Sequence, residues 1–373
     1  MSYFSIPADF KIETVDKYID INERYDDQII ETYGQINSKD NLFGSGRPWD
    51  LIPLVGWGEL EKYICYSQKN NIKFNYVLNS LCLGNKEFTD EGVDEILCFI
   101  KQLYSIGITS LTVAMPSLIE LIKYTGLPFE IKASTICNIT NSDRAKSYKT
   151  MGVDRIVLDE SINRDFNELR AIRKVYGEKV ELIANVICYK NCIYRFYHHN
   201  QMSHDWEYGK KNSIDYYSNR CALKRMDKPE NILKMNFIRP EDITYYEDIG
   251  IQYFKLQGRQ AVMKGNLPKA VESYFKRSYD GDLLLLLDSF TPTNNFRQPI
   301  HNKSLDGFIE PFYRNNICSN NCSQCNYCSE FFSHNFLVKD TIETNNLAKT
   351  YYSSTDSYIN KIKKIMGDKI NGE

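Results

Sequence analysis

The sequence predicts an α/β protein of the (β/α)8 class, a TIM-type barrel with a cysteine-rich C-terminal extension. Short β-branched runs alternate with amphipathic helical stretches from the N-terminus to about residue 259. Parallel strands need a long crossover connection, usually a helix, so this alternation indicates a parallel sheet. Eight strand–helix units suffice to close a barrel, and 373 residues is an ordinary length for one with added loops. An open doubly wound sheet is the alternative topology.

The expected strands are short, and each is separated from the next by enough chain for a helix. Each contains the apolar and β-branched residues that favour a buried strand. In chain order they are Tyr3–Pro7, Gln28–Tyr33, Phe74–Asn79, Ser110–Ala114, Glu130–Ser134, Arg155–Asp159, Val180–Ile187 and Gln252–Leu256.

The stretches between the strands have the period of amphipathic helices. After Asp90, apolar residues recur on one helical face, as expected for a helix that covers a barrel. They are Val93, Ile96, Leu97, Ile100 and Leu103. Asn141 begins an Asn-Ser-Asp segment that can cap a helix running to Met151, and Gly152 can end it.

The expected domain division is a barrel at residues 1–288, with an insertion at 188–236, followed by an extension at 289–373. The insertion is long, polar and rich in tyrosine, and long connections inside compact domains are usually functional or disordered. The extension contains a dense cysteine cluster at 318–328 and a polar tail with helical character at 356–366.

Composition and charge narrow the class of protein. The formal net charge of -2 gives no general attraction to nucleic acid or anionic membranes, although a local basic patch leaves a nucleic-acid partner open. The first ten residues lack the basic and apolar regions of a signal peptide, and no apolar run reaches membrane-spanning length. We therefore expect a cytoplasmic protein without membrane association. In that compartment, eleven cysteines favour metal ligands or reactive thiols over disulfides.

The strongest chemical motif is a C-x3-C-x2-C-x2-C pattern near the C-terminus. Its members are Cys318, Cys322, Cys325 and Cys328. Thiolates this close in sequence can surround one metal centre with a small loop-closure cost. Soft sulfur ligands suit an iron–sulfur cluster or zinc, and the C-x2-C-x2-C core resembles the spacing of ferredoxin ligands. The motif therefore predicts a metal-binding site for a [4Fe–4S] cluster, with a structural zinc ion as the alternative.

A second cysteine set lies near the predicted barrel mouth. Cys188 and Cys192 follow the seventh strand, and Cys221 lies late in the insertion. The ends of the strands form the C-terminal face of a barrel, where active sites gather. Three thiolates are one short of a complete site, which leaves room for a substrate or a fourth ligand. The candidates for that ligand are Cys82, Cys137 and a cysteine of the tail. Three unrelated buried thiols are the alternative interpretation.

Basic and small residues follow other strands. Arg47 comes after the second strand, and Lys255 and Arg259 end the eighth. These cations can bind a carboxylate or phosphate, with arginine as the bidentate partner. Gly44 and Gly46 would allow the backbone to approach a ligand closely. Asn79, Ser80, Ser134, Thr135 and residues 159–161 complete the polar set. We therefore expect a small anionic co-substrate.

The remaining candidates are expected to have structural or solvated roles. Cys65 and Cys98 are expected in the core, because they lie on helical faces. Three histidines of the insertion are expected to be solvated rather than metal ligands: His198, His199 and His204. The sequence has no H-E-x-x-H, G-x-S-x-G or P-loop motif, so the zinc protease, serine hydrolase and NTPase mechanisms have no support.

Four motifs resemble the peptidase family U32, over about residues 43–312. Residues 43–47 are similar to the family's F-G-A-R, and 130–141 to its H-A-S-T-Q and V-T-N. Residues 152–158 resemble G-V-x-R-V-V-L, and 250–259 resemble G-I-D-S-L-K-I-E-G-R. The chain departs from these motifs at a few positions. They are Lys132 for His, Asp159 for Arg, Ile238 for Cys and Gln257 for Glu.

The resemblance implies a (β/α)8 barrel and two kinds of activity. Family members were named collagenase-like peptidases. Better-understood relatives are iron–sulfur proteins that hydroxylate ubiquinone precursors, transfer RNA or ribosomal RNA without oxygen, some with prephenate as the hydroxyl source. The resemblance gives Cys188, Cys192 and Cys221 a cluster-binding role.

These observations predict an oxidoreductase, an iron–sulfur-dependent and oxygen-independent hydroxylase or related modifying enzyme. It would carry one or two [4Fe–4S] clusters and use a prephenate-like co-substrate. A U32-type peptidase is the first alternative. The second is a non-catalytic subunit that is stabilised by metal and binds a protein partner.

Overall fold

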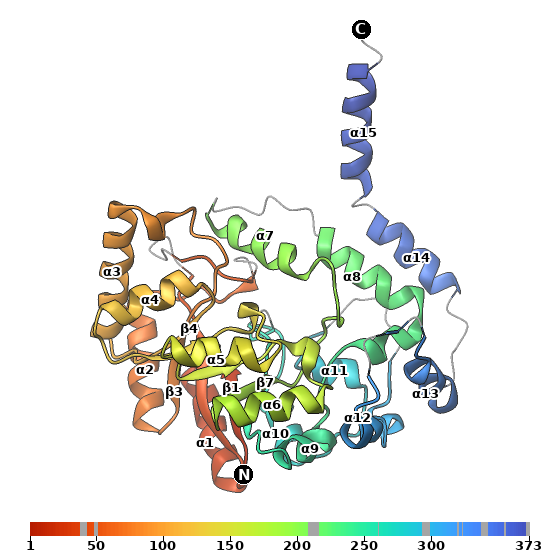
Figure 1. The fold of residues 1–373 in the computed structure, drawn as a ribbon, viewed down its shortest axis with the longest axis horizontal. Helices are drawn as coiled ribbons and strands as arrows, with labels where there is room; N and C mark the ends of the chain where they lie inside the picture. The colour runs from red at the N-terminus through yellow and green to blue at the C-terminus, as the bar shows by residue number, and fades with distance from the viewer. Residues whose placement is uncertain are drawn as a thin grey trace.

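The computed structural model describes most of the chain, and its described residues form a closed barrel of eight parallel strands (Figure 1). The described ranges are 1–37, 43–47, 51–207, 216–259, 261–292, 299–318, 321–322, 324–336, 342–353 and 356–370. Parts of the predicted insertion and extension, such as 208–215 and 337–341, lie outside them. The predicted (β/α)8 class is confirmed.

The strands pair in sequence order, and the first pairs with the last through Tyr3 and Tyr253. Each predicted strand is present, with shifts at the ends. They are β1 (Tyr3–Pro7), β2 (Gln28–Gly34), β3 (Lys73–Leu78), β4 (Ser110–Val113), β5 (Glu130–Ala133), β6 (Arg155–Val157), β7 (Val180–Ile183) and β8 (Tyr253–Lys255).

The seventh strand is shorter than the predicted Val180–Ile187, because Asn185 ends its ladder. The amide of Asn185 donates hydrogen bonds to the carbonyls of Gln257, at 2.8 Å, and Leu287, at 3.0 Å. The backbone N–H of Val186 then turns back to the carbonyl of Ala184. The chain therefore leaves the barrel four residues earlier than its apolar pattern suggests.

Helices cover the outside of the barrel and carry the apolar faces that the sequence predicts. They are α1 (Ile12–Arg24), α2 (Trp57–Lys69), α3 (Asp90–Ser105), α4 (Pro116–Tyr124), α5 (Ser142–Thr150), α6 (Phe166–Tyr176), α9 (Ile243–Glu247) and α10 (Leu267–Phe275). The side chain of Asn141 caps α5 as predicted, by accepting from the N–H of Arg144. Gly152 follows that helix with a φ of +78°, which favours glycine.

The inside of the barrel holds a buried ionic group of two acids and two bases. Lys132 donates to Glu31 at 2.5 Å and to Glu181 at 2.7 Å, and all three side chains are almost fully buried. Arg155 lies 3.7 Å from Glu181 on the other side. Burial raises the pKa of Glu181, but the charges of Lys132 and Arg155 outweigh it and lower that pKa to about 2.

The helices of the insertion and residues 342–352 of the extension lie on the side of the barrel away from the N-terminus, whereas residues 310–315 of the extension lie beside α9 (Figure 1). The insertion contains α7 (Arg195–Glu207), α8 (Tyr216–Asp227) and the 3-10 helix η5 (Pro229–Lys234). The remaining helices are α11 (Leu283–Leu287), α12 (Glu310–Asn315), α13 (Tyr327–Asn335), α14 (Ile342–Tyr352) and α15 (Asp356–Ile370). Ala222 of α8 packs against Ala348 and Tyr352 of α14, so the two segments support each other.

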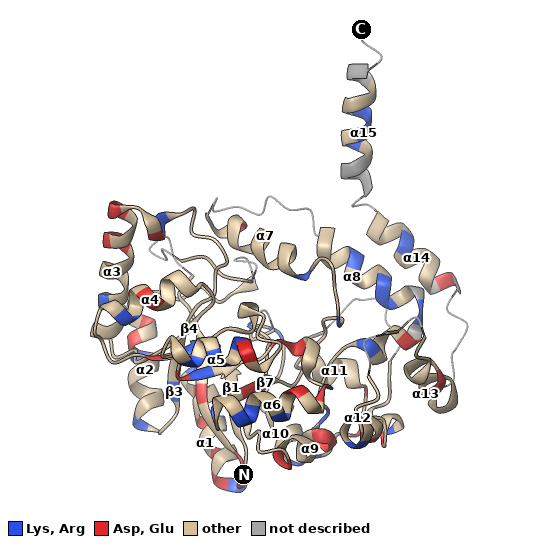
Figure 2. Ribbon diagram, viewed as in Figure 1, with Lys and Arg blue, Asp and Glu red and all other residues tan. Residues whose placement is uncertain are grey.

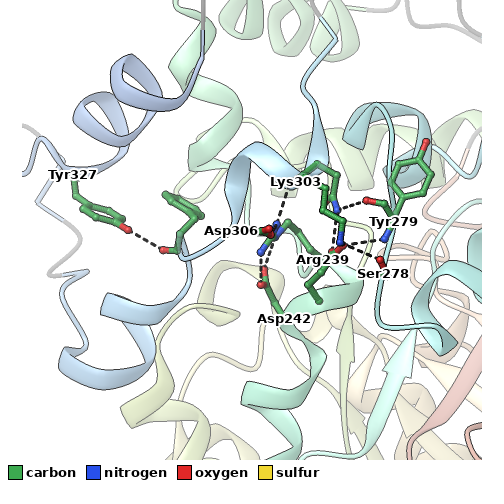
Figure 3. A network of polar contacts seen from close by, with 10 residues as sticks. Arg239, Asp242, Ser278, Tyr279, Lys303, Asp306 and Tyr327 are labelled. Carbon is green, nitrogen blue, oxygen red and sulfur yellow. Dashed lines mark hydrogen bonds and ion pairs between the residues drawn. The ribbon is translucent and has the colours of Figure 1, made fainter.

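A polar network fastens the start of the extension to the chain that leads into β8 (Figure 3). The buried guanidinium of Arg239 forms a paired contact with Asp242, at 2.8 and 3.0 Å, and reaches Asp306 at 2.9 Å. Lys303 contacts Glu241 at 2.7 Å. The contacts of Arg239 with Asp306 and of Lys303 with Glu241 therefore join the extension to the chain that leads into β8.

The charged residues are mixed over the molecule, as the small net charge predicts. Both basic and acidic residues lie on the helices around the barrel, whereas α8 shows mainly basic ones (Figure 2). In the part of the chain that the structure describes, no helix is both long enough and apolar enough to cross a lipid bilayer.

Candidate functional site

A pocket of about 500 Å³ opens at the C-terminal ends of the strands. All three predicted cations line it: Arg47, Lys255 and Arg259. The barrel winding therefore brings together residues more than two hundred positions apart. The other polar lining residues are Tyr33, Asn79, Thr112, Ser134, Thr135, His199 and Gln257.

Neutral groups hold Arg259 in place. Its guanidinium donates to Gln35 at 2.7 Å and to the hydroxyl of Ser45 at 3.0 Å, and it lies 3.4 Å from the amide oxygen of Asn79. Burial lowers the pKa of Arg259 to about 9, and the charge of Arg47 adds to that effect. Because its partners carry no negative charge, the positive charge of Arg259 is left for a ligand.

Arg47 is also held by a neutral partner. Its guanidinium donates to the side-chain oxygen of Gln257 at 2.9 Å, and the Gln257 amide donates to the carbonyl of Asn185 at the same distance. A glutamate here, as in the family motif, would neutralise Arg47. Among the described residues, no carboxylate forms a salt bridge with Arg47, Lys255 or Arg259. The pocket is therefore cationic.

Lys255 lies over an aromatic ring at the pocket floor. Its ammonium is 3.6 Å from the centre of the Tyr33 ring, and the Tyr33 hydroxyl donates to the carbonyl of Leu256 at 2.7 Å. Burial is the main cause that lowers the pKa of Lys255, to about 7, and the charge of Lys132 acts in the same direction. Lys255 can therefore gain or lose a proton near neutral pH.

His199 lines the pocket, so the expectation that it is solvated is wrong. Burial and then the charge of Arg47 hold its pKa well below the usual value, so the imidazole is neutral at neutral pH. Its Nδ1 has no hydrogen-bond partner in the described chain. His199, Met202, Ser203 and Trp206 follow helical spacing, and this period was the sequence signal that could have placed His199 on the inner face.

Helix α7 is fixed over the barrel mouth by polar contacts of three of its side chains. The indole N–H of Trp206 donates to the carbonyl of Arg47 at 2.6 Å, and the hydroxyl of Ser203 accepts from the N–H of Leu81 at 3.0 Å. Arg195 pairs with Asp159 at 2.7 Å and with Glu160. After β6, this chain has Asp159 where the family motif has an arginine. Arg195 of α7 brings a guanidinium group to the same place by pairing with Asp159 and Glu160.

The barrel-mouth cysteines lie beside this pocket. Cys188 packs against Val157 and Ile183, which also line the pocket. Burial raises the pKa of Cys188 to about 12. Glu160 and Cys221 also raise it, whereas Arg195 lowers it. Cys192 in turn raises the pKa of Cys221, although burial is the larger cause. The thiols therefore interact electrostatically with one another.

Thiol side chains at this place fit a soft metal centre by the nature of their donor atoms. Within the described ranges, however, no three Cys, His, Asp or Glu side chains converge closely enough to hold a single metal ion. Cys188, Cys192 and Cys221 would be the protein ligands of a larger group, such as a cluster, bound beside the pocket.

The other cysteines have different surroundings. The thiol of Cys137 donates to the carbonyls of Val113, at 3.5 Å, and Ala114, at 3.3 Å, and the sulfur of Cys82 accepts from the N–H of Gly84 at 3.4 Å. Cys65 and Cys98 are exposed, so the expectation that they are core residues is wrong. Each lies on its helix just outside the buried stripe, next to a residue that is buried.

The four cysteines of the tail line one pocket of their own, of about 370 Å³. They are Cys318, Cys322, Cys325 and Cys328. Lys234 of η5 lies on its wall, and the ammonium of Lys190 is 3.6 Å from the sulfur of Cys318. The structure therefore brings the tail cluster against the segment that carries Cys188 and Cys192.

Comparisons with known proteins agree with the motifs. Residues 55–277, more than half of the chain, match the model of peptidase family U32. A protein named "uncharacterized protease" from Methanocaldococcus jannaschii is 32% identical over 344 residues, which is 91% of this chain and 100% of the relative. The solved structure of the U32 peptidase Mk0906 is similar in fold, with a TM-score of 0.51 at 15% identity. That likeness covers 69% of this chain and 93% of the other.

Proposed function

Because the chain belongs to peptidase family U32, we propose that it is an iron–sulfur-dependent, oxygen-independent hydroxylase or a closely related modifying enzyme. The observation that carries the proposal is the position of Cys188. Its side chain packs on the apolar cluster of Val157, Ile183 and Val186, and two members of that cluster, Val157 and Ile183, line the cationic pocket. An electron-transferring centre and an anion-binding site would therefore share a wall.

The protein's own residues would bind and orient an anionic co-substrate. Arg47 and Arg259 present guanidinium groups to the same pocket, and each can hold a carboxylate in a bidentate manner. Lys255 can hold a proton at Nζ or release it near neutral pH. A small dicarboxylate of the prephenate type matches this arrangement in charge. The substrate that receives the hydroxyl group would enter from the same open side.

An iron–sulfur cluster bound by Cys188, Cys192 and Cys221 would supply one-electron transfer and, at an open iron position, a Lewis acid. The C–O bond of the co-substrate would break with its hydroxyl group leaving as hydroxide, so that the co-substrate is not itself reduced. Replacing a substrate C–H bond by C–OH with that hydroxide would release one proton to water and leave two electrons. An external electron carrier of the flavin or ferredoxin class would accept them. Helix α7 would exclude water, since Trp206 and Ser203 hold it over the mouth.

The proposal is tested on protein purified without oxygen. We expect a brown protein that contains iron and sulfide, and we expect Cys188→Ala to lose the colour. Cys98→Ala is the matched control, because Cys98 is an exposed thiol away from the mouth. Colourless wild-type protein without iron would exclude the proposal.

A peptidase is the second candidate, and the names of the family and of its Methanocaldococcus relative favour it. In that case, cleavage of unfolded protein substrates should persist in Cys188→Ala and in metal-free protein. Loss of cleavage in Lys255→Met alone would then point to Lys255 as the proton-transferring group.

A non-catalytic subunit is the third candidate. A wild-type phenotype of cells that carry a Lys255→Met/Arg259→Met double variant would support it.

A further inference from the structure

The tail cysteines surround a pocket that is built into the fold. The wall opposite the thiols is formed by Lys234 of η5 and Phe312 of α12. Tyr327, at the start of α13, donates from its hydroxyl to the carbonyl of Phe308 at 3.0 Å, and the two rings stack with centres 5.6 Å apart (Figure 3). These contacts hold the cysteine segment against the barrel. The four cysteines therefore line one pocket, although among the described residues no three such side chains converge closely enough to hold a single metal ion.

A buried cation lies against the ring of Phe312, a residue that lines this pocket, and lacks a full set of partners. Arg164 is 3% exposed, and only its Nη1 is paired, with the carbonyl of Leu233 at 2.5 Å. Its Nε and Nη2 have no hydrogen-bond acceptor among the described residues. Burial lowers the pKa of Arg164, whereas the neighbouring Cys328 raises it. Buried donors of this kind are rare unless a ligand or charge completes them.

The rings around Arg164 leave its charge in place. Its guanidinium carbon lies 4.8 Å from the ring centre of Phe237 and 4.9 Å from that of Phe308. Aromatic faces attract a cation but accept little charge, so an anionic group is still needed on the open side. The groups near Arg164 that can carry such a charge include Asp242 and the tail cysteines Cys318 and Cys328.

Lys190 connects the tail pocket to the barrel mouth. It lies in sequence between Cys188 and Cys192, and its ammonium is 3.6 Å from the sulfur of Cys318. The backbone of that segment is also tied to η5, because the N–H of Lys190 donates to the carbonyl of Lys234 at 3.4 Å. Lys190 therefore joins the segment that carries Cys188 and Cys192 to the tail pocket.

We infer that Cys318, Cys322, Cys325 and Cys328 hold an iron–sulfur cluster of their own, next to the barrel-mouth site. Four thiolates and a cluster are anionic together, and Arg164, Lys190 and Lys234 supply cations around them. The thiols surround a pocket, which is the arrangement that a multi-atom cluster needs. The C-x2-C-x2-C core has the spacing of cluster ligands.

The exposure of the tail cysteines indicates the direction of electron flow, a step that rests on the proposed function. Cys322 and Cys325 are exposed, whereas Cys318 and Cys328 are half-buried on the side of the barrel. The cluster would therefore take single electrons from the barrel-mouth site and pass them at the surface to the external carrier of the flavin or ferredoxin class. Each electron that leaves the substrate would reduce that carrier.

The test counts iron and acid-labile sulfide in full-length protein purified without oxygen. We expect wild-type protein to contain two clusters. Cys322→Ser/Cys325→Ser and Cys188→Ser/Cys192→Ser should each lose half of the iron and sulfide. Cys65→Ser/Cys98→Ser is the control and should lose none, because those thiols are exposed outside both sites. The two ligand pairs fail separately, so the tail site and the proposed function are judged independently.

The tail-cluster inference is overturned if Cys322→Ser/Cys325→Ser keeps all of its iron and sulfide, or loses zinc in their place. The inference would also be overturned if the Cys188→Ser/Cys192→Ser variant contained no iron at all, because the tail site would then hold none. If the tail variant does not fold, the metal content of wild-type protein decides, because it requires no variant: iron for two clusters supports the inference, and one cluster with zinc contradicts it.

A second measurement tests the contact of Lys190 with the tail site. Reduction adds negative charge to a cluster, so a neighbouring cation favours the reduced form. Lys190→Gln should therefore lower the midpoint potential of one cluster, followed by electron paramagnetic resonance during a redox titration. Lys101→Gln, at an exposed position on α3, should leave both potentials unchanged. Unchanged potentials in Lys190→Gln would contradict the assigned contact.

Discussion

Lys255 shows how a single position in a barrel can combine binding with proton transfer. Its place at the end of β8 puts the ammonium in the pocket, and its distance of 3.6 Å from the Tyr33 ring centre keeps it there. Burial favours the neutral amine, and its pKa falls to about 7. A bound anion would favour the charged form and raise that pKa again. Binding of an anion and uptake of a proton are therefore linked.

The first prediction follows from that linkage. Above about pH 7, the free protein has a neutral Lys255, so an anion must bind together with a proton. The affinity for prephenate should therefore fall as pH rises, by at most about tenfold per pH unit. Calorimetry in buffers with different ionisation enthalpies should detect the proton uptake. In Lys255→Met, the affinity should be lower and independent of pH in this range; an unchanged pH dependence would contradict the role of Lys255.

A second prediction concerns Gln257. Its side-chain oxygen accepts from Arg47 at 2.9 Å, so Gln257→Glu would create an ion pair at the same place. Because that pair would neutralise one cation of the pocket, anion affinity should fall about tenfold or more. Titration calorimetry measures the effect. Gln252→Glu adds the same charge at an exposed position and should change the affinity little. Equal effects of the two substitutions would argue against a local pairing.

At the scale of single residues, the sequence predicted part of the site. Arg47, Lys255 and Arg259 were found because a residue that follows a barrel strand must lie at the C-terminal face. His199 was missed because its helix lies in an insertion with no strand to place it. Cys98 was assigned to the core although its neighbour Phe99 is the buried residue, since a helix face is defined only to within about one position.

Helix α7 is the element that closes the barrel mouth. Arg195, at its first turn, is mostly buried and joins Asp159 and Glu160 of the chain after β6. The carboxyl of Glu160 also accepts from the hydroxyl of Thr135 at 2.7 Å. The helix is therefore attached at its N-terminal end by charge and further along by Ser203 and Trp206. In the sequence, only the helical spacing of His199, Met202, Ser203 and Trp206 marks the inner face of this helix.

The third prediction tests this attachment. Arg195→Ala leaves Asp159 and Glu160 buried without a cationic partner, so unfolding free energy should fall by about 3–5 kcal/mol. Urea denaturation of the two proteins measures the difference. Arg24→Ala is the control: it breaks an exposed pair with Glu272 and should lower the unfolding free energy far less than Arg195→Ala does. A loss of similar size in both variants would mean that burial of the Arg195 contacts is unimportant.

The whole molecule joins a barrel to an extension through a few buried polar contacts. Arg239 is 2% exposed and holds Asp242 from the barrel side and Asp306 from the extension (Figure 3). Further along, Tyr327 and Arg164 bring the tail cysteines to the same flank. The position of the tail cluster therefore depends on contacts between segments more than sixty residues apart.

The fourth prediction concerns this attachment. Arg239→Met leaves the buried Asp242 without its partner, and it should lower unfolding free energy by about 3–5 kcal/mol. It should also expose the extension to proteases at lower temperature than in the wild type. Thermal unfolding with limited proteolysis measures both. Arg314→Met breaks an exposed pair with Glu310 and should change neither.

The topology of the barrel was predictable because eight strand segments alternate with helical segments in the sequence. Right-handed, unknotted connections leave few other arrangements for such a chain. The end of β7 was not predictable, because an amide side chain from residue 185 interrupts an apolar run. The spacing of the tail cysteines predicted a metal site, but not its neighbours. Arg164 and Lys190 reach it from distant segments, and only the folded chain brings them there.

The ionic group inside the barrel has a consequence for how this protein can change over evolutionary time. The charges of this group sum to zero over Glu31, Lys132, Arg155 and Glu181. If any one of these residues were lost alone, a charge would be left unpaired in the barrel interior, away from water. Homologues should therefore inherit these positions as a set: where a neutral residue or a histidine replaces Lys132, one of the glutamates should have been replaced as well. Independent drift at the four positions across an alignment would contradict this constraint.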